Sequence, residues 1–210
     1  MKFKTLAWLS MAVLTWGACT SSRADVAGEL DGVQVEDSAT VGGTKLLLNG
    51  VATRKRGYFK TDVTTLYLAE KCRTLECVYH AKGPKRIQLS VLRDLNGGLI
   101  SRYFVSDFKS VATEAEFKQL ITEVGQIGEL YGRLGQVKKG DVSTIDWIPG
   151  KGIQSRINGK VQSAGGADFM NSELMYQILL RMYVGEQAAA EYRRGLLGLD
   201  DTLSRTTAGR

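Results

Sequence analysis

The sequence predicts an α+β fold in which an antiparallel β-sheet is packed on one face by a layer of helices. Segments with the two-residue period of strands are joined by hairpin signals, which favours antiparallel pairing. Two stretches with helical periodicity, residues 100–134 and 169–197, form blocks and do not alternate singly with the strands. Helices grouped in this way are typical of α+β proteins, and the cleft between the sheet and the helices is a natural place for a ligand.

The predicted strands begin in the first third of the chain. Residues 33–35 and 44–48 have the composition of two short strands, and Asn49-Gly50 follows them as a turn signal. The segment 54–68 predicts the longest strand, because β-branched and aromatic residues alternate along it. One of its faces carries Phe59, Thr61, Val63, Thr65 and Tyr67. Residues 86–92 predict a further strand, whose inward face carries Ile87, Leu89 and Val91.

The first helical block contains two predicted helices. The apolar residues of the first recur at helical spacing and are Ile100, Phe104, Phe108 and Val111. Thr113 followed by Glu116 is a capping box, which predicts the start of a second helix that runs to Leu134. The apolar stripe of this second helix is Phe117, Leu120, Ile121, Val124, Ile127, Tyr131 and Leu134.

The second half of the chain returns to strands before it ends in helices. Residues 142–148 predict a strand that stops at Pro149-Gly150. Asn158-Gly159 separates two further strand-like segments, 152–157 and 160–161, and is the strongest hairpin signal in the sequence. The final predicted helices cover residues 169–182 and 188–197 and are closed by Gly185 and Gly198.

Residues 1–24 have the pattern of a secretory signal peptide. Two lysines precede an apolar stretch over residues 6–16, and a stretch of small residues ends at Ala24. The apolar stretch is too short to span a bilayer of roughly 30 Å. We therefore expect cleavage after Ala24 and a periplasmic or secreted protein. The alternative is a lipoprotein anchored through Cys19, because Gly17-Ala18-Cys19 resembles the end of a lipobox.

The rest of the chain predicts one domain with a short tail. Residues 25–199 are enough for a single hydrophobic core, and residues 200–210 have little to bury and are expected to be flexible. Removal of the signal peptide lowers the net charge at pH 7 from +6 to +3. Nucleic-acid binding normally requires a concentrated basic patch, so no nucleic-acid partner is expected. No later apolar stretch is long enough for a transmembrane helix.

Two cysteines remain after cleavage. In an oxidising compartment Cys72 and Cys77 predict a local structural disulfide, with free thiols as the alternative. Their spacing differs from that of a thioredoxin-like redox pair, and no further cysteine or histidine cluster completes a zinc site. His80 is the single histidine and is expected in a solvated loop. We therefore expect neither a metal nor a cofactor.

Arg54 is the residue best suited to bind an anion. It stands at the start of the predicted long strand, and a planar guanidinium binds carboxylate or phenolate through paired hydrogen bonds. The alternative is an ordinary surface cation. Lys60 and Asp62 share a strand face and are expected to form a solvated ion pair. Three tyrosines are candidate hydrogen-bond donors to a ligand, and they are Tyr58, Tyr67 and Tyr103. The alternative is that their rings pack in the protein with the hydroxyl group at the edge of the core.

Several segments together resemble the chalcone-isomerase-like family, particularly its exported bacterial branch. They are residues 37–46, 48–51, 58–60, 66–68, 83–86, 92–94, 137–141 and 189–198, together with Arg54. The resemblance covers nearly all of residues 28–198. It implies an antiparallel sheet, a helical layer on one face and a ligand cleft between them.

The resemblance also implies roles for particular residues. In plant enzymes of the family an arginine before the long strand holds an oxyanion while a phenolate adds across an unsaturated ketone, and Arg54 matches this arginine. The other enzyme positions differ, because Asp62 stands in place of a strand threonine and Ile100 in place of the catalytic tyrosine. Asp107 stands in place of an asparagine. A small shift of the helix alignment brings Tyr103 into the site.

These differences favour binding over catalysis. Positioned donors contribute about 3 kcal/mol each to a transition state, and two of them are replaced. Fatty-acid-binding members of the family use the same arginine to hold a carboxylate. The leading hypothesis is an exported, non-catalytic protein that binds a small amphipathic carboxylate or phenolic ligand, such as a fatty acid. Its predicted site residues are Arg54, Asp62, Tyr103 and Asp107.

Two alternatives remain open beside this hypothesis. One is an isomerase, an intramolecular lyase that uses the same arginine, and the other is a structural or partner-binding role without a small ligand. The leading hypothesis requires that the protein itself does not neutralise the charge of Arg54, and that an apolar hollow lies behind this side chain.

Overall fold

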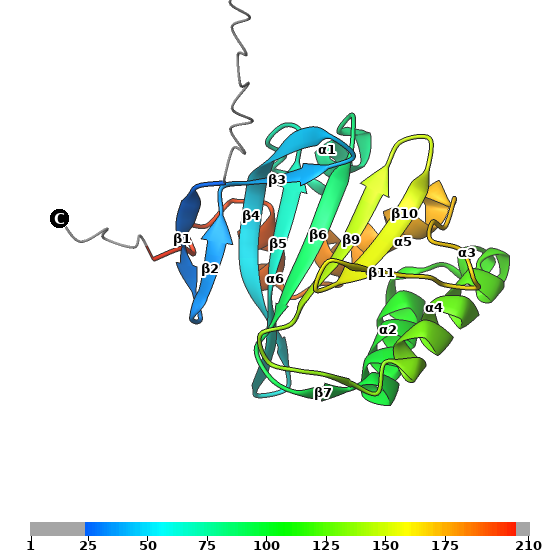
Figure 1. Ribbon diagram of the computed structural model, residues 1–210. Coiled ribbons are helices and arrows are strands. Elements are labelled where there is room, and N and C mark those ends of the chain that lie inside the picture. The colour runs from blue at the N-terminus through cyan, green and yellow to red at the C-terminus, as the bar shows by residue number, and fades with distance from the viewer. Residues whose placement is uncertain (1–23, 205–210) are drawn as a thin grey trace, which may run out of the picture.

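The computed structural model describes residues 24–204, and its centre is a seven-stranded antiparallel sheet (Figure 1). In spatial order its strands are β11 (Lys160–Gln162), β10 (Gly152–Ile157), β9 (Val142–Ile148), β6 (Lys85–Val91), β5 (Phe59–Leu68), β4 (Thr44–Arg56) and β3 (Ser38–Val41). Two small antiparallel sheets accompany it. One pairs β1 (Val26–Leu30) with β2 (Val33–Glu36), and the other pairs β7 (Leu95–Asn96) with β8 (Gln136–Val137).

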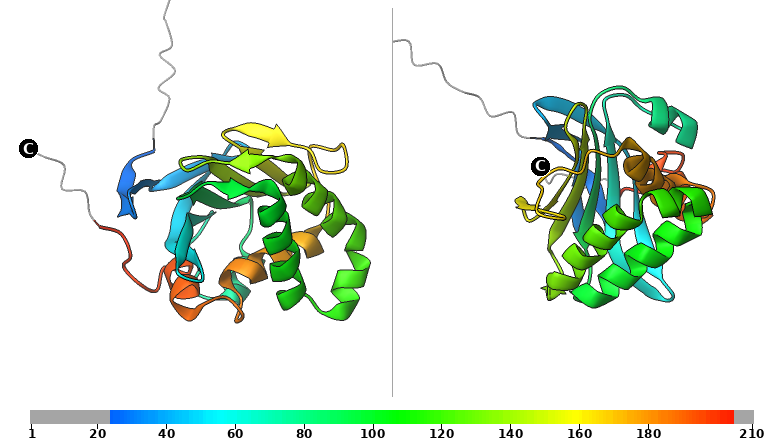
Figure 2. Two further views of the ribbon diagram at one scale, coloured as in Figure 1. Left: turned by 90° about the horizontal axis from the view of Figure 1, so that it is seen from below. Right: turned by 90° about the vertical axis from the view of Figure 1, so that its right-hand side faces the viewer.

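The larger helices lie on one side of the main sheet, which curls around them (Figure 2). The helices of the described range are α1 (Leu75–His80), α2 (Gly97–Val111), α3 (Glu114–Gln119), α4 (Ile121–Arg133), α5 (Glu173–Val184) and α6 (Ala190–Leu196). None of them combines the length and the apolar character needed to cross a membrane. The predicted α+β architecture, an antiparallel sheet with a helical layer on one face, is confirmed.

Each face of the sheet packs its own apolar cluster. On the helical face Leu66 of β5 belongs to a core shared with α2, α4, α5 and α6. On the opposite face Val63 and Tyr67 of the same strand pack with residues of β2, β3 and β4. The predicted alternation is therefore confirmed within β5, which is buried on both faces from Thr61 onward, but the single strand expected over residues 54–68 is wrong, because residues 54–56 end β4 and a turn precedes Phe59.

The boundaries of β4 differ from the prediction. Asn49-Gly50 is not a turn, because β4 continues through it with an irregular register between Leu48 and Gly50, and the chain reverses at Gly57-Tyr58. The Asn49 side chain donates to the Leu196 carbonyl oxygen at 2.9 Å and accepts from the Cys72 amide at 2.7 Å. Gly50 has no room for a Cβ, which would overlap backbone carbonyl groups of α6. Packing against α6 thus keeps Asn49-Gly50 within a strand, although this dipeptide is typical of a turn.

The later hairpins agree with the prediction. β9 and β10 are joined across Pro149-Gly150, and β10 and β11 across Asn158-Gly159. Asn158 and Gly159 have φ values of 50° and 78°. Both are positive, as a two-residue type I′ turn requires.

The helical layer confirms some predictions and corrects one. Thr113 Oγ1 accepts from the Glu116 amide at 3.2 Å, and Glu116 Oε2 accepts from the Thr113 amide at 2.8 Å, so the capping box is formed. The helix that we expected from this box to residue 134 is divided at Leu120 into α3 and α4. Leu120 is buried at this break, whereas its neighbour Ile121 is 58% exposed. The apolar residues of α3 and α4 therefore do not form one continuous buried stripe.

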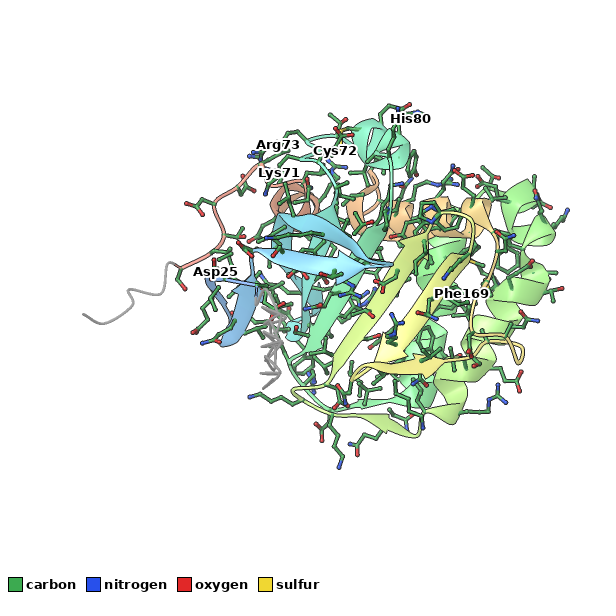
Figure 3. The ribbon with its side chains drawn as sticks, turned by 45° about the horizontal axis from the view of Figure 1, so that its top comes forward. Asp25, Lys71, Cys72, Arg73, His80 and Phe169 are labelled. Carbon is green, nitrogen blue, oxygen red and sulfur yellow. A yellow bond between two sulfur atoms is a disulfide. The ribbon has the colours of Figure 1, made fainter. Side chains whose placement is uncertain are left out.

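Cys72 and Cys77 form the predicted disulfide, which links the loop after β5 to α1. The short helix α1 was not predicted, and His80 lies on it and not in a loop. His80 is exposed, as expected, and its Nε2 lies 2.7 Å from Glu76 Oε1. Figure 3 places His80 and Cys72 at the same end of the molecule.

The chain after α6 contacts β1 and β4 as far as Ser204, while the expected flexibility of residues 200–210 stays a prediction. Thr202 donates to the Val51 carbonyl oxygen at 2.9 Å, and Ser204 and Glu29 exchange two backbone hydrogen bonds of 3.0 Å. Residues 205–210 lie outside the described range, as do residues 1–23 with the lipobox cysteine Cys19 and most of the predicted signal peptide.

Candidate functional site

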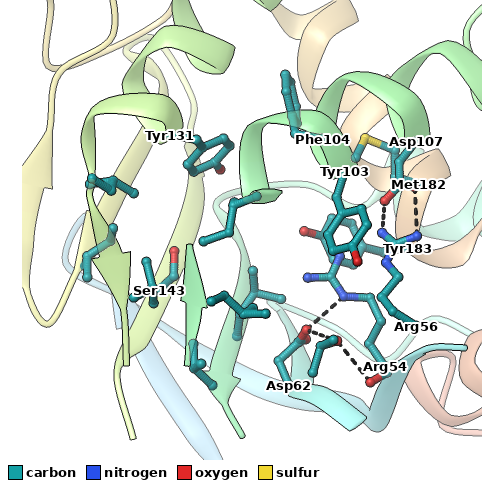
Figure 4. Close-up of a pocket in the computed structure, with 18 residues that line it drawn as sticks. Arg54, Arg56, Asp62, Tyr103, Phe104, Asp107, Tyr131, Ser143, Met182 and Tyr183 are labelled. Carbon is teal, nitrogen blue, oxygen red and sulfur yellow. Dashed lines mark hydrogen bonds and ion pairs between the residues drawn. The ribbon is translucent and has the colours of Figure 1, made fainter. Parts of the chain in front are cut away.

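A largely apolar pocket lies between the sheet and the helical layer (Figure 4). Together with its open part it encloses about 780 Å³. Its apolar lining is Leu89, Val91, Leu95, Ile100, Phe104, Leu134, Val137, Ile157 and Met182. Its polar lining is Arg54, Arg56, Thr61, Asp62, Tyr103, Asp107, Tyr131, Ser143 and Tyr183.

The structure brings the four predicted site residues together at this pocket. Arg54 comes from β4, Asp62 from β5, and Tyr103 and Asp107 from α2. The arginine and the two carboxylates gather on one side of the pocket, and Tyr131 lies on the other (Figure 4). A charged end and an apolar remainder are therefore combined in one hollow.

Other residues that we considered lie elsewhere. Tyr58 is fully exposed at the β4–β5 turn, and Tyr67 is buried in the cluster on the opposite face of the sheet. Lys60 pairs with Asp31 of the β1–β2 turn, so the expected pair of Lys60 with Asp62 is not formed. His80 lies on α1 and does not line the pocket.

Arg54 is paired inside the protein, contrary to the requirement that its charge be unneutralised. Arg54 and Asp62 are directly opposite each other in the β4–β5 ladder, and Arg54 Nε donates to Asp62 Oδ2 at 2.9 Å. The side chain of Asp62 is only 3% exposed, whereas that of Arg54 is 25% exposed. Hydrogen bonds to Asp62 use Nε alone, so the terminal amino groups of Arg54 are the donors left for a ligand.

A chain of hydroxyl groups fixes the Asp62 carboxylate. Thr64 donates to Asp62 Oδ1 at 2.7 Å, and Tyr192 of α6 donates to Thr64 Oγ1 at 2.7 Å. Thr61 Oγ1 lies 2.9 Å from Asp62 Oδ2. Asp62 is therefore a hydrogen-bonded anchor that orients Arg54, because its oxygen atoms already have partners within the protein.

The electrostatics of the pocket keep its donors protonated. Burial alone lowers the pKa of the Arg54 guanidinium, but the adjacent Asp62 carboxylate together with Tyr183 and Tyr192 outweighs burial and holds the pKa well above its ordinary value. Burial raises the pKa of the Tyr183 hydroxyl, and the charge of Arg54 offsets only part of this rise. Burial also raises the pKa of Tyr131. At neutral pH the arginine is charged and both phenols are neutral donors.

A second ion pair separates the apolar pocket from a more polar hollow. Arg56 Nη1 donates to Asp107 Oδ1 at 2.9 Å, and Nη2 pairs with the other carboxylate oxygen. The Arg56 guanidinium also lies over the Tyr103 ring, 4.9 Å from its centre. Arg54, Arg56, Asp107 and Met182 line both hollows, and the second one encloses about 850 Å³ with its open part. These side chains therefore form the partition between the two.

Tyr131, Tyr183 and Arg56 were not predicted as site residues. Tyr131 belongs to the predicted apolar stripe of its helix, and Arg56 follows Arg54 by two residues, but neither position indicated a role in binding. Tyr183 lies one residue beyond the predicted helix, and its guanidinium neighbour, Arg54, is 5.5 Å from the centre of its ring. Within residues 24–204 no group of acidic, histidine or cysteine side chains has an arrangement that suits a metal ion.

The chain belongs to the chalcone isomerase-like family, because the model of that family matches residues 27–198. Among solved structures, a fatty-acid binding protein of Arabidopsis thaliana is similar to it, with a TM-score of 0.64 and 14% sequence identity. The similarity covers 82% of this chain and 96% of the plant protein. At this identity the similarity shows a shared fold. No curated protein matches the chain by sequence.

Proposed function

We propose that the pocket binds a small amphipathic acid, such as a fatty acid, without catalysing a reaction. The observation that carries this proposal is the place of Arg54, which is held by Asp62 through Nε and lies in the wall of a largely apolar hollow. A ligand carboxylate would bind the terminal amino groups of Arg54, and its tail would lie along the apolar lining. This division suits a ligand with one anionic end.

Asp62 determines how such a ligand can bind. Because Asp62 holds the Nε edge of the guanidinium, the ligand carboxylate would approach the edge formed by Nη1 and Nη2. The Tyr183 hydroxyl is the second donor, since its ring lies beside the guanidinium. Asp62 also offsets the charge of Arg54, so the affinity depends on the fixed direction of these donors and on the burial of the tail.

The comparisons support the proposal through the family and through the plant neighbour. The neighbour is described as a fatty-acid binding protein, and it shares the fold over 82% of this chain. We further propose that the protein is exported after cleavage of residues 1–24, as in the exported bacterial branch of the family. The disulfide between Cys72 and Cys77 supports this location, because disulfides persist in oxidising compartments.

An isomerase of the intramolecular lyase type is the second candidate. The observation that favours it is the set of hydroxyl groups in the pocket, because Tyr103, Tyr131 and Thr61 line it together with Arg54. Against it, Thr61 Oγ1 is within hydrogen-bond distance of Asp62 and of the Arg54 carbonyl oxygen, so its hydroxyl is already engaged. Ile100, at the position that resembles the catalytic tyrosine, has no donor.

The experiment compares ligand binding by the chain from Asp25 onward and by two variants. Lauric and palmitic acid are titrated by calorimetry, and lipids that co-purify with the protein are identified by mass spectrometry. Arg54→Gln removes a hydrogen bond to a charged group, so we expect affinity to fall by about ten- to a hundredfold. Lys45→Gln removes an exposed cation from the same strand and should leave affinity unchanged.

A double variant controls for stability. Arg54→Gln alone leaves the buried Asp62 carboxylate without its cation, which destabilises a protein. Arg54→Gln/Asp62→Asn removes both charges, and it should remain folded while binding fatty acid as weakly as Arg54→Gln. Equal affinity of the wild type and the folded double variant would overturn the proposal. Arg54-dependent cyclisation of a chalcone would establish the isomerase instead.

A further inference from the structure

The turn between β4 and β5 presents two aromatic side chains to solvent. Tyr58 is fully exposed at the apex, and Phe59 beside it is 60% exposed. The other large apolar side chains exposed in the described range are separate from one another in sequence, and they are Val26, Leu47, Ile121 and Leu199. An adjacent exposed pair at the tip of a hairpin is therefore the feature of this surface that requires an explanation.

Basic side chains surround this aromatic tip. Lys55 and Lys60 are paired across the β4–β5 ladder immediately beside it. The Arg93 guanidinium lies over the Phe59 ring, 4.2 Å from its centre. Since the Leu92 amide donates to the Thr61 carbonyl oxygen at 2.9 Å, the segment that carries Arg93 runs along the start of β5.

Two more lysines approach from the loop after β8. The Gly140 amide donates to the Val91 carbonyl oxygen at 2.9 Å, and the Lys139 amide donates to Asp94 Oδ1 at 2.8 Å. These contacts hold exposed Lys138 and Lys139 next to the segment that packs on Phe59. The aromatic tip and its basic surroundings thus come from three separate parts of the chain.

The nearby carboxylates do not neutralise all of these cations. Asp31 pairs with Lys60, whereas Asp94 and Asp141 accept hydrogen bonds from backbone amides and from side-chain amides. Among the described residues, four cations near the tip form no ion pair, and they are Lys55, Arg93, Lys138 and Lys139. This end of the molecule therefore presents aromatic surface together with unpaired positive charge.

The same end of the molecule leads to the pocket. Arg54 and Arg56, which line the pocket, precede the turn on β4, and Leu95 and Val137 of β7 and β8 line it as well. Figure 1 shows the tip of the β4–β5 hairpin and β7 at the same lower end of the molecule. A surface that met this end would therefore lie next to the residues that line the pocket.

We propose that the aromatic tip docks the protein on an anionic lipid surface. Tyr58 and Phe59 would enter the headgroup region, where aromatic side chains are favoured, and the four unpaired cations would lie over acidic headgroups. A protruding tip with charges on its sides suits a fluid surface that deforms around it. Docking stands on this geometry alone, whereas transfer of a fatty acid between the surface and the pocket also rests on the proposed function.

The test is sedimentation of the chain from Asp25 onward, which contains the whole described fold, with lipid vesicles. Vesicles of phosphatidylcholine containing about 30% phosphatidylglycerol are compared with pure phosphatidylcholine, at about 50 mM and about 300 mM salt. We expect binding to the anionic vesicles at low salt, weakened by high salt. Tyr58→Ser/Phe59→Ser should lower the bound fraction roughly fivefold or more, and Lys55→Gln/Lys139→Gln should lower it as well.

Matched variants distinguish the tip from exposed residues elsewhere. Ile121→Ser removes an apolar side chain of similar exposure from α4, and Lys45→Gln/Lys82→Gln removes two other exposed lysines. Both should bind vesicles like the wild type. The fluorescence of the tryptophan in a Tyr58→Trp variant should also be quenched by brominated lipid in the anionic vesicles. This quenching reports insertion of the tip itself.

The proposal is overturned if the wild type does not bind anionic vesicles at low salt, or if the aromatic double variant binds them equally well. Binding of the tip to another protein without binding to vesicles would overturn it too. Fatty-acid affinity without vesicles should be unchanged in Tyr58→Ser/Phe59→Ser, and vesicle binding should be unchanged in Arg54→Gln. Failure of docking is therefore distinguishable from failure of the proposed function.

Discussion

Two arginine–aspartate pairs join neighbouring strands of the same sheet but leave different parts of the arginine free. On the face away from the helices, Arg86 of β6 binds Asp146 of β9 through Nε at 2.6 Å and Nη2 at 2.7 Å. Asp146 is 0% exposed and also accepts from Arg156 Nη1 at 3.3 Å. On the helical face, Asp62 binds Arg54 through Nε alone. Both are direct cross-strand pairs, so the difference lies in what surrounds them.

The comparison shows that pairing by itself does not separate a structural arginine from a binding one. The Arg86 side chain is 15% exposed and directs two nitrogen atoms at one carboxylate, so its donors are largely used inside the protein. Asp62, by contrast, is also bound by the hydroxyl groups of Thr61 and Thr64, and the outer edge of the Arg54 guanidinium stays available at the pocket. Each carboxylate has three hydrogen bonds, and the share that its cross-strand arginine supplies determines how much of the guanidinium a ligand can reach.

The largest effect that we expect comes from breaking the Arg86 pair. Arg86→Leu leaves the fully buried Asp146 carboxylate with one longer bond to Arg156, and removal of one partner of a buried pair costs about 3 kcal/mol or more. Urea unfolding measures this loss of stability. Fatty-acid binding at a concentration of urea where the variant is still folded should be unchanged. A loss below about 1 kcal/mol would show that the pair is not needed for stability.

A smaller effect is expected at alkaline pH, where the two faces can be compared through their tyrosines. Burial raises the pKa of Tyr67, the cross-strand neighbour of Arg86, to about 12. The unfolded chain loses this proton first, near pH 10. The contribution of Tyr67 to the free energy of unfolding is therefore complete below that pH and is lost as the pH rises toward 12. The loss is at most about 1.4 kcal/mol per pH unit for one tyrosine.

Urea midpoints at several pH values test this. Tyr67→Phe should reduce the fall of the unfolding free energy with pH above about pH 10. Tyr183→Phe, beside Arg54, should reduce it too, because burial also raises the pKa of Tyr183. An unchanged slope in Tyr67→Phe would show that this phenol does not carry the effect. At neutral pH neither variant should change the slope.

A modest change is expected when the charge of Asp62 alone is removed. Asp62→Asn keeps an acceptor for Arg54 but removes the negative charge that competes with a ligand carboxylate, so fatty-acid affinity should rise by roughly three- to tenfold. Asp146→Asn is the matched variant on the other face, and it should lower stability without changing affinity. Calorimetric titration measures both. Weaker binding by Asp62→Asn would mean that Asp62 itself contacts the ligand, for example a protonated acid or a phenol.

Local signals in the sequence predicted much of the fold because they depend on few residues. The capping box of Thr113 and Glu116 and the turn at Asn158-Gly159 formed as expected, since each is satisfied by its own neighbours. Helix α1 was not predicted, because its six residues carry too little periodicity to be recognised. The break at Leu120 was missed because an apolar stripe does not show where a helix must change direction.

The pairing of Arg54 depended on the position of one turn. Had a single strand begun at Arg54, its eight-residue distance from Asp62 would have placed the two side chains roughly 26 Å apart. The turn is at Gly57-Tyr58, so the same residues lie opposite each other and bind. The turn could not be placed there from local pattern, because Asn49-Gly50 is the stronger turn signal and only contact with α6 cancels it.

Residue types were sufficient to predict the alternation of the strands, the helical blocks, the cysteine pair and the candidate arginine. These features follow from residue types and from spacing along the chain. Three further features depend on tertiary contacts: Arg54 binds Asp62 through Nε alone, Tyr183 and Tyr131 line the same hollow, and Tyr58 and Phe59 form an exposed tip among unpaired cations. Each of these depends on which distant strands and helices meet, and that is set by the burial of side chains that lie far apart in the sequence.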